Sequence, residues 1–291
     1  MLFPQDFLTR LEYLSIISKR VFRGTLLAQR RTMQRGAGIE FSDHREYSPG
    51  DDFRYLDWNV YARHGDLLLK RFQEEQDLQV YLMLDCSRSM GFGDPPKFRL
   101  ARQLIAALAY IALADLDRIA VLAFADEIIA EFPMTRGKAQ ILGLMEFLKK
   151  LEIAGTDTSL SRAAQGVLHR SRKSGMAVVV SDLFDPHRFQ SGLDQLRYRK
   201  FDAHVLQLFD PYEADPQLLG DVELLDVETN HARKVTVTEK NVRTYKKLFQ
   251  EHQDSVRYYC RNYGLGCTQT PATVRFDDLI LTMMRAAGQV G

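Results

Sequence analysis

Cysteine is scarce in this sequence. Its 291 residues include 3 cysteines, Cys86, Cys260 and Cys267, and no two of them have Cys-x-x-Cys spacing. An odd number of widely spaced cysteines predicts neither a disulfide framework nor a zinc site. Reduced thiols of this kind are typical of proteins that work in the cytosol.

Long hydrophobic runs are also missing. The longest apolar run, residues 104–114, is well short of the roughly 20 residues that cross a bilayer. The first residues, MLFPQDFLTRLEYL, include acids ahead of Lys19 and Arg20 and lack the apolar core of a signal peptide. We therefore expect neither secretion nor membrane insertion, and a cytoplasmic location.

The sequence carries almost no net charge. It has 39 Lys and Arg against 38 Asp and Glu, a balance of +1, which gives no global reason to expect nucleic acid as a partner. Acidic residues from Glu40 onward directly follow a basic stretch and can neutralise it within the protein. We therefore expect no nucleic-acid binding and keep it as an alternative function. The basic stretch consists of Lys19, Arg20, Arg23, Arg30, Arg31 and Arg35.

Short, continuously apolar runs alternate with helical patterns after Asp77. Such runs are typical of strands that are buried on both faces of a sheet. The expected strands span residues 80–84, 118–124, 128–132 as an edge strand, 176–180, 204–208 and 266–268. Because parallel neighbours need a crossover helix, this alternation predicts an α/β fold, a doubly wound and mainly parallel sheet.

Helical patterns fill the intervals between these strands. They cover residues 7–28, 98–116, 139–151, 161–172, 242–263 and 276–287. Residues 222–237 read as a hairpin inserted into the series. We divide the chain into an N-terminal helix with a β-rich extension, residues 1–77, and a main domain, residues 78–291, with the hairpin insertion near residues 221–238.

Polar residues follow two of the expected strands. Ligands of an open parallel sheet gather at the carboxyl ends of its strands. Asp, Ser and Thr supply the hard oxygen ligands that Mg²⁺ prefers, and a site with few charged ligands can accept a further carboxylate from another protein. The sequence therefore predicts one site for Mg²⁺ or Mn²⁺, with the ligands Asp85, Ser87, Ser89, Thr156 and Asp182.

This constellation resembles the metal-ion-dependent adhesion site of von Willebrand factor type A domains. Asp85, Ser87 and Ser89 match its Asp-x-Ser-x-Ser motif, and Asp182 matches the aspartate that follows a later strand. Its threonine corresponds to Thr156, with Thr158 two residues on as an alternative. The resemblance implies a Rossmann-like protein-binding domain.

The tract REYSPGDDFRYLDW, residues 45–58, with Ala62 and Arg63 beyond it, resembles the signature of the bacterial domain-of-unknown-function-58 family. In that family the signature precedes such a type A domain, and the proteins are associated with MoxR-type AAA+ ATPases. The resemblance covers the chain from about Gly36 to the last helix and implies a MoxR-type ATPase or its client as the partner.

The residues of this tract also have a structural interpretation. Alternating Arg and Asp side chains around Trp58, the only tryptophan, favour a buried ion-pair network. We expect Trp58 to anchor the extension to the main domain. A docking surface is the alternative.

An enzyme is the remaining alternative, in the form of a metal-dependent phosphohydrolase of haloacid dehalogenase type. Such enzymes carry a second Asp two residues after the nucleophile, and Ser87 stands at that place after Asp85. The sequence also lacks a Gly-x-x-x-x-Gly-Lys-Ser/Thr phosphate loop and His-x-x-x-His spacing. Cys86 is expected to be packed, not reactive. We therefore expect no enzyme, but a metal-dependent protein-protein interaction module, an adaptor for a MoxR-type ATPase.

Overall fold

A six-stranded sheet forms the centre of the computed structural model. The structure describes residues 2–30, 40–73, 78–155, 157–171, 173–225 and 232–289. The strands of the sheet are β3 (Gln79–Asp85), β4 (Arg118–Phe124), β5 (Ile128–Arg136), β6 (Met176–Ser181), β7 (Asp202–Phe209) and β10 (Gly266–Pro271). They lie in the order β10-β7-β6-β3-β4-β5, and all neighbours are parallel except β4 and β5. The predicted α/β class is confirmed, as is the edge position of β5.

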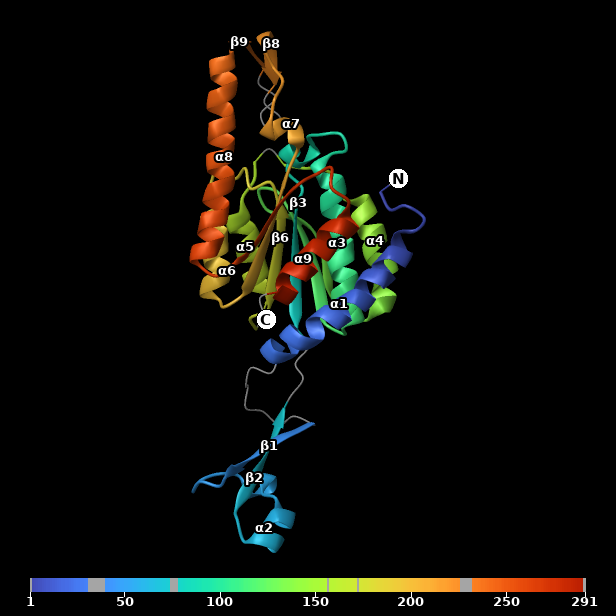
Figure 1. Cartoon of the computed structure of the whole chain (residues 1–291), viewed down its shortest axis with the longest axis vertical. Coiled ribbons are helices and arrows are strands. Elements are labelled where there is room, and N and C mark those ends of the chain that lie inside the picture. The colour runs from blue at the N-terminus through green and yellow to red at the C-terminus, as the bar shows by residue number, and fades with distance from the viewer. Residues whose placement is uncertain are drawn as a thin grey trace.

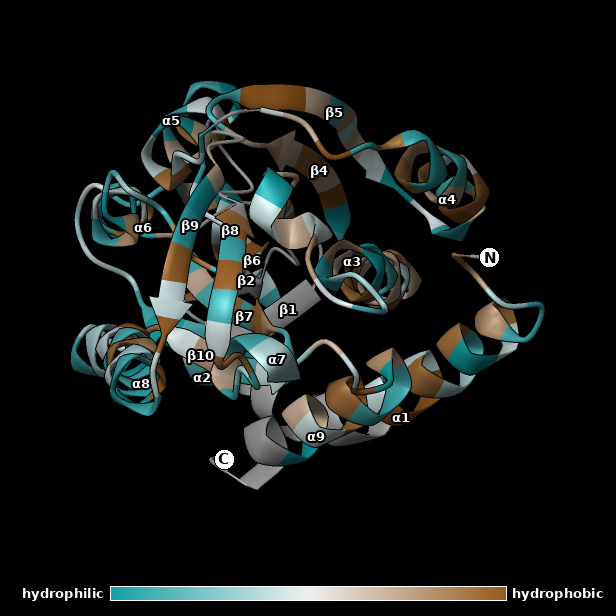
Figure 2. Cartoon of the chain, turned by 90° about the horizontal axis from the view of Figure 1, so that it is seen from above, coloured by the Kyte–Doolittle hydropathy of each residue, from teal (hydrophilic) through white to brown (hydrophobic). Residues whose placement is uncertain are grey.

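Helices cover both faces of this sheet (Figure 2). On one face lie α1 (Phe7–Arg30), α3 (Lys97–Ala114), α4 (Ile141–Lys150) and α9 (Phe276–Gln289); on the other lie α5 (Leu160–Arg170), α6 (Phe189–Tyr198) and α8 (Glu239–Asn262). Each face has its own hydrophobic cluster, because successive strand residues point to opposite sides and both sets are apolar. The sheet is therefore doubly wound, as predicted.

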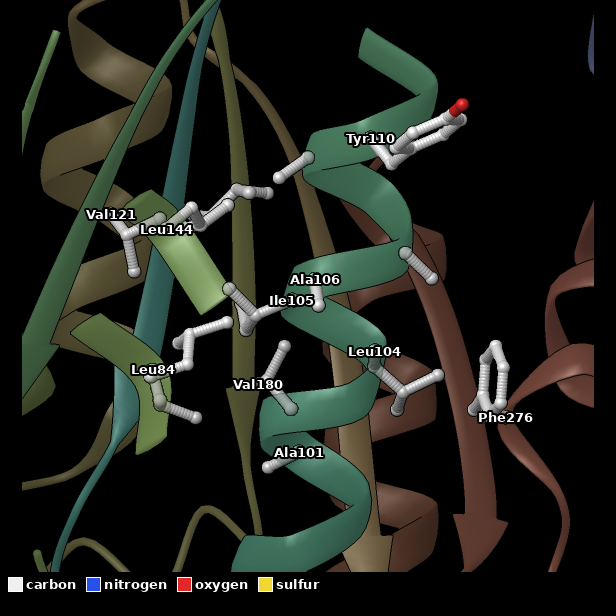
Figure 3. Close-up of a cluster of buried hydrophobic side chains, with 14 of the residues drawn as sticks. Leu84, Ala101, Leu104, Ile105, Ala106, Tyr110, Val121, Leu144, Val180 and Phe276 are labelled. Carbon is white, nitrogen blue, oxygen red and sulfur yellow. The ribbon is translucent and has the colours of Figure 1, made fainter. Parts of the chain in front are cut away.

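Helix α3 lies at the centre of the larger cluster (Figure 3). Several of its alanines are fully buried, and such small side chains let a helix approach a sheet closely. Ile105 points toward Leu84 of β3, whereas Leu104 points toward Phe276 at the start of α9. Helix α3 therefore connects the sheet to the outer helices.

Helix α1 packs against this main domain through α3 and α9. Leu11 and Leu14 are fully buried, and the Phe7 ring lies 4.7 Å from that of Phe276. The Arg10 guanidinium donates to Asp277 at 2.9 Å. The helix that we grouped with the extension is thus part of the main core. The side chains of the basic stretch between Lys19 and Arg35 lie outside the described part of the chain.

Helix α6 is an element that the sequence pattern did not predict. It is short and mostly polar, and its buried side chains are Phe189, Leu193 and Leu196, with Gly192 between them. Leu160 of α5 approaches Gly192 so closely that a Cβ there would lie 2.6 Å from Leu160 Cγ. Tertiary packing against α5, not a long apolar stripe, stabilises this crossover helix.

Residues 40–73 form a small separate unit at one end of the molecule (Figure 1). It consists of β1 (Glu40–Glu46), the short 3₁₀ helix η1 (Phe53–Tyr55), α2 (Trp58–His64) and β2 (Leu68–Gln73), which pairs antiparallel with β1. Among the side chains of this unit that the structure describes, Leu56 and Leu69 are the buried apolar ones. Asp57 caps α2, and its carboxylate lies 2.9 Å from His44 Nε2 and 3.5 Å from Lys70 Nζ.

Two expectations for the signature tract were wrong. Its pair of Arg54 with Asp52 is exposed and its pair of Arg45 with Asp51 is only partly buried, so these arginine–aspartate pairs do not form a buried network. Trp58 is 60% exposed and makes an edge contact with Tyr61 of its own helix. A unit of this size has too little interior to enclose guanidinium groups or an indole ring.

The predicted hairpin is present as β8 (Gly220–Leu225) and β9 (Ala232–Val237), an antiparallel pair apart from the main sheet. Its turn lies outside the described residues. The four-residue helix α7 (Pro211–Ala214) connects β7 to it. None of the helices in the described ranges combines the length and apolar composition that a membrane crossing requires.

Candidate metal centre

The candidate site lies at the carboxyl ends of β3 and β6, which are parallel neighbours in the sheet. Leu84 pairs with Val180, so the next residues, Asp85 and Ser181, lie side by side. The Ser181 hydroxyl donates to Asp85 Oδ2 at 2.5 Å, and the amide of Ser87 donates to Asp85 Oδ1 at 2.8 Å. Asp85 is fully buried, and both of its oxygens accept protein hydrogen bonds.

The 3₁₀ helix η2 (Arg88–Gly91) brings the two serines of the motif together. The hydroxyl oxygens of Ser87 and Ser89 lie 3.1 Å apart, with Ser87 fully buried and Ser89 half-buried. The tight turn thus directs alternate side chains toward one point, as the spacing predicts.

Cys86, between Asp85 and the serines, faces the apolar core. Its amide donates to the carbonyl of Phe124, and its own carbonyl accepts from Ala154. The side chain is fully buried, and burial raises the pKa of its thiol. The expectation that Cys86 is packed is confirmed.

The threonine loop lies against the end of β4. The amide of Ser159 donates to the carbonyl of Ala125 at 2.8 Å. Gly155 has a φ of +81°, and a Cβ there would lie 2.6 Å from that of Ala125, so only glycine fits. Thr156 lies outside the described residues, whereas Thr158 is buried. Thr158 therefore remains a candidate ligand alongside Thr156.

Asp182 is also buried, but a lysine that we did not predict binds it. The Lys97 ammonium donates to Asp182 Oδ2 at 2.8 Å and to Glu213 Oε1 at 2.5 Å. The Lys97 side chain is fully buried. Burial alone would lower its pKa, but the carboxylates of Asp182 and Glu213 outweigh burial and raise the pKa above its usual value.

One sequence signal could have identified Lys97. It is the first residue of α3, and that first turn contains no acid. A cation at a helix N-terminus is unfavourable, because the helix dipole places partial positive charge there. A buried lysine at this position therefore needs carboxylates from elsewhere in the fold.

Among the described side chains of the site, negative charge exceeds positive charge. Burial, and then the nearby charge of Asp182, raise the pKa of Asp85 to about 7, although hydrogen bonds from Ser181 and Ser87 oppose this. Asp85, Asp182 and Glu213 together bring three carboxylates against the single ammonium of Lys97. When all are ionised, a divalent cation would compensate the excess negative charge.

The chemistry of the donors restricts how a cation could be held. No cluster of three or more His, Cys, Asp or Glu side chains with metal-site geometry occurs in the described ranges. Asp85 and Asp182 must therefore be supplemented by the hydroxyls of Ser87, Ser89 and the threonine loop. This all-oxygen set fits Mg²⁺ or Mn²⁺ better than it fits zinc.

Comparison with known proteins identifies the family. The family model described as "Protein of unknown function DUF58" matches residues 43–255. The chain belongs to this family. The match includes the signature tract and the strands that carry the candidate site.

Relatives occur in mycobacteria. The chain is 24% identical to uncharacterized proteins of Mycobacterium tuberculosis and Mycobacterium bovis over 258 residues, which covers 87% of this chain and 81% of each relative. An uncharacterized protein of Mycobacterium avium is 27% identical over 110 residues, covering 38% of this chain and 64% of the relative.

Solved structures with a similar arrangement come from several sources. The conserved hypothetical protein BatB of Bacteroides thetaiotaomicron has a TM-score of 0.44 at 14% identity, covering 74% of this chain and 100% of that one. An aerotolerance-related membrane protein of Bacteroides fragilis has a TM-score of 0.47 at 14% identity, covering 73% and 99%. The manganese-loaded TRAP protein of Plasmodium vivax has a TM-score of 0.35 at 18% identity, covering 45% and 57%.

Proposed function

We propose that this DUF58 protein is a divalent-cation-dependent protein-interaction module of the von Willebrand type A kind. One observation carries the proposal: two serine hydroxyls lie 3.1 Å apart next to buried carboxylates whose charge a single lysine does not balance. A partner's carboxylate would complete the coordination of Mg²⁺ or Mn²⁺ at this site.

The described residues would have different roles in holding the cation. Asp85 and Asp182 already accept hydrogen bonds at each oxygen, Asp182 from Lys97 and from the Phe184 amide. They would act mainly through their charge and through bound water. The hydroxyls of Ser87 and Ser89 would be direct ligands, which leaves the cation electrophilic enough to accept an external carboxylate.

The same arrangement argues against hydrolysis. A phosphohydrolase needs a general acid near its nucleophile, and the residue two positions after Asp85 is the hydroxyl-bearing Ser87. The Lys97 ammonium is held by Asp182 and Glu213, where a raised pKa makes it a poor proton donor. We expect no turnover of phosphomonoesters or nucleotides. Activity that disappears in Asp85→Asn would refute this expectation.

For the partner we propose a MoxR-type AAA+ ATPase or a client of that ATPase. The proposal rests on family membership and on the association that the resemblance implies. The residue 40–73 unit lies away from the candidate site in Figure 1, so it could provide a second contact that does not depend on metal.

Calorimetric titration tests the metal site first. Mg²⁺ or Mn²⁺ should bind the wild-type chain and not Asp85→Asn, whereas Asp254→Asn, an exposed acid on α8, should bind as the wild type does. If the wild type fails to bind either cation, the metal site is refuted.

Titration of the cognate MoxR-type ATPase then tests the interface. We expect weaker binding in EDTA than in Mg²⁺, because the partner's carboxylate loses its ligand. Equal affinity in both conditions would exclude the metal from the interface, and no binding in either would exclude this partner.

A further inference from the structure

Four partly exposed aromatic side chains lie on segments next to the candidate site, and we refer to them as the aromatic rim. They are Phe92, Phe184, Tyr212 and Tyr245, with exposed fractions of 36%, 39%, 41% and 42%. Phe92 directly follows the 3₁₀ helix of the serine motif, and Phe184 comes two residues after Asp182. The chain thus places a large ring beside each part of the polar site.

Contacts connect these rings to the residues around the buried ammonium of Lys97. Lys97 Nζ lies 5.6 Å from the centroid of the Phe184 ring and donates to Glu213, the neighbour of Tyr212. The Tyr212 ring lies 6.5 Å from that of Phe92. Phe184 therefore borders the Lys97 ion pairs, and Tyr212 and Phe92 lie together beside the segment that carries Glu213.

Tyr245 belongs to this group through its ring contacts. Its pKa is raised, first by burial and then by the charge of Glu213. Its ring stacks on Phe249 at 6.3 Å, and Phe249 in turn lies 6.4 Å from Phe184.

Further contacts hold the rings in place. Phe184 stacks on the His252 ring at 5.0 Å. The amide of Tyr212 donates to Asp210, which caps α7. Gly93 lies so close to Asp210 that a Cβ at position 93 would clash with the Asp210 carboxylate. Rings held in this way lose little conformational freedom when they bind a partner.

Single exposed apolar residues are common, but aromatic rings that converge on one polar site are typical of interface hot spots. Phenylalanine and tyrosine bury a large area at a low entropic cost. The partner that fits such a surface carries both an acid and large apolar groups.

We propose that the aromatic rim selects a partner segment in which the carboxylate-bearing residue is flanked by large apolar side chains. The inference rests on the proposed function, because the acid is taken to bind at the cation site. The acid complements the cation, and its neighbours pack on Phe92 and Tyr212 on one side and on Phe184 on the other.

Fluorescence polarisation with labelled nine-residue peptides tests this in Mg²⁺. The peptides are serine-rich, with a central glutamate flanked either by two phenylalanines or by two serines, and a third has glutamine between the phenylalanines. We expect the phenylalanine-flanked glutamate to bind about tenfold more tightly than the serine-flanked one, since burying one large apolar side chain is worth at least a factor of ten. EDTA should abolish the binding of both.

Variants localise the effect. Tyr212→Ser and Phe184→Ser should remove most of the advantage of the flanking phenylalanines, whereas Tyr212→Phe should keep it. Tyr258→Ser, on the distant end of α8 and more exposed than any rim residue, should leave all affinities unchanged.

The outcomes separate the two proposals. If both glutamate peptides bind equally in Mg²⁺ and neither binds in EDTA, the rim proposal is overturned and the proposed function stands. If the glutamine peptide binds as tightly as its glutamate counterpart, the rim does not act together with an acid and the proposal is again overturned. If no peptide shows Mg²⁺-dependent binding, the proposed function is overturned, and the rim proposal with it.

Discussion

The six-stranded sheet and the residue 40–73 unit differ in how far their ion pairs are exposed to solvent. In the main domain the ion pair of Lys97 with Asp182 lies in a fully buried environment. In the small unit the pair of Arg54 with Asp52 is open to solvent on both sides. Most of both regions lies within the matched family segment, yet the Lys97 pair is enclosed, whereas the Arg54 pair is exposed to solvent.

The difference reflects how much apolar surface each region can bury. Two hydrophobic clusters surround the sheet, and an interior of that size can enclose charges if they are paired. In the small unit, the buried apolar side chains within the described part are Leu56 and Leu69. The stability of this unit therefore depends on helix capping and exposed ion pairs, and the Trp58 side chain is exposed to solvent.

The largest effect that we expect from this comparison comes from Lys97→Met. The variant leaves Asp182 buried without its counter-charge, which should lower the free energy of unfolding by about 3–5 kcal/mol in EDTA. Urea titration measures this. Lys149→Met, which removes an exposed pair with Glu146, should have little effect. If both substitutions lower the free energy of unfolding by the same amount, buried and exposed ion pairs do not differ in their contribution to stability.

Apolar truncation tests whether the two regions unfold together. Leu104→Ala, in the centre of the larger cluster, should lower the free energy of unfolding by about 2–5 kcal/mol. Leu56→Ala should leave the main unfolding transition in place and speed hydrogen exchange within residues 40–73. If Leu56→Ala shifts the main transition as far as Leu104→Ala does, the unit is not an independent element.

The pH dependence of the metal-free protein provides a smaller effect. The pKa of Asp85 is about 7 in the folded chain and 3.8 in its ordinary state, so between these values the folded protein holds a proton that the unfolded chain has released. The stability from this proton is complete below pH 3.8 and is lost as the pH rises through about 7.

Asp85→Asn should remove the loss of stability that accompanies ionisation of Asp85 as the pH rises. In EDTA at pH 8, above the raised pKa of Asp85, the variant should melt at a higher temperature than the wild type. Mg²⁺ should raise the melting temperature of the wild type alone. Differential scanning calorimetry across the pH range provides the measurement, and identical pH profiles for both proteins would contradict the prediction.

The smallest effect is expected in the residue 40–73 unit. The pKa of Asp57 is lowered to about 2, first by the bond with His44 and also by the amides of α2, against the effect of burial. This stability is present above the ordinary pKa of 3.8 and is lost as the pH falls toward about 2. Asp57→Asn should speed hydrogen exchange in α2 and leave the main transition unchanged. Asp66→Asn, on an exposed residue beyond α2, is the matched control; the same acceleration there would exclude a specific role for Asp57.

Much of the main domain could be predicted because its signals are local. Residues 118–124 form a strand with the predicted bounds, since a continuous apolar run fits a strand buried on both faces. Helix α6 was missed although its buried side chains, Phe189, Leu193 and Leu196, have helical spacing, because the segment is short and contains Gly192. Trp58 was misplaced because composition does not reveal how little interior surrounds it.

The candidate site also has features that the sequence predicted and one that it did not. The sequence by itself determined that Asp85, Ser87, Ser89 and Asp182 come to one end of the sheet, because parallel neighbours align their carboxyl ends. Metal binding there stays a prediction. Only the tertiary structure decided that Lys97 binds the carboxylates of the site. In the sequence, Lys97 is 85 residues from Asp182 and 116 residues from Glu213. A side chain's partner over such a separation depends on how the helices pack on the sheet, which no local pattern specifies.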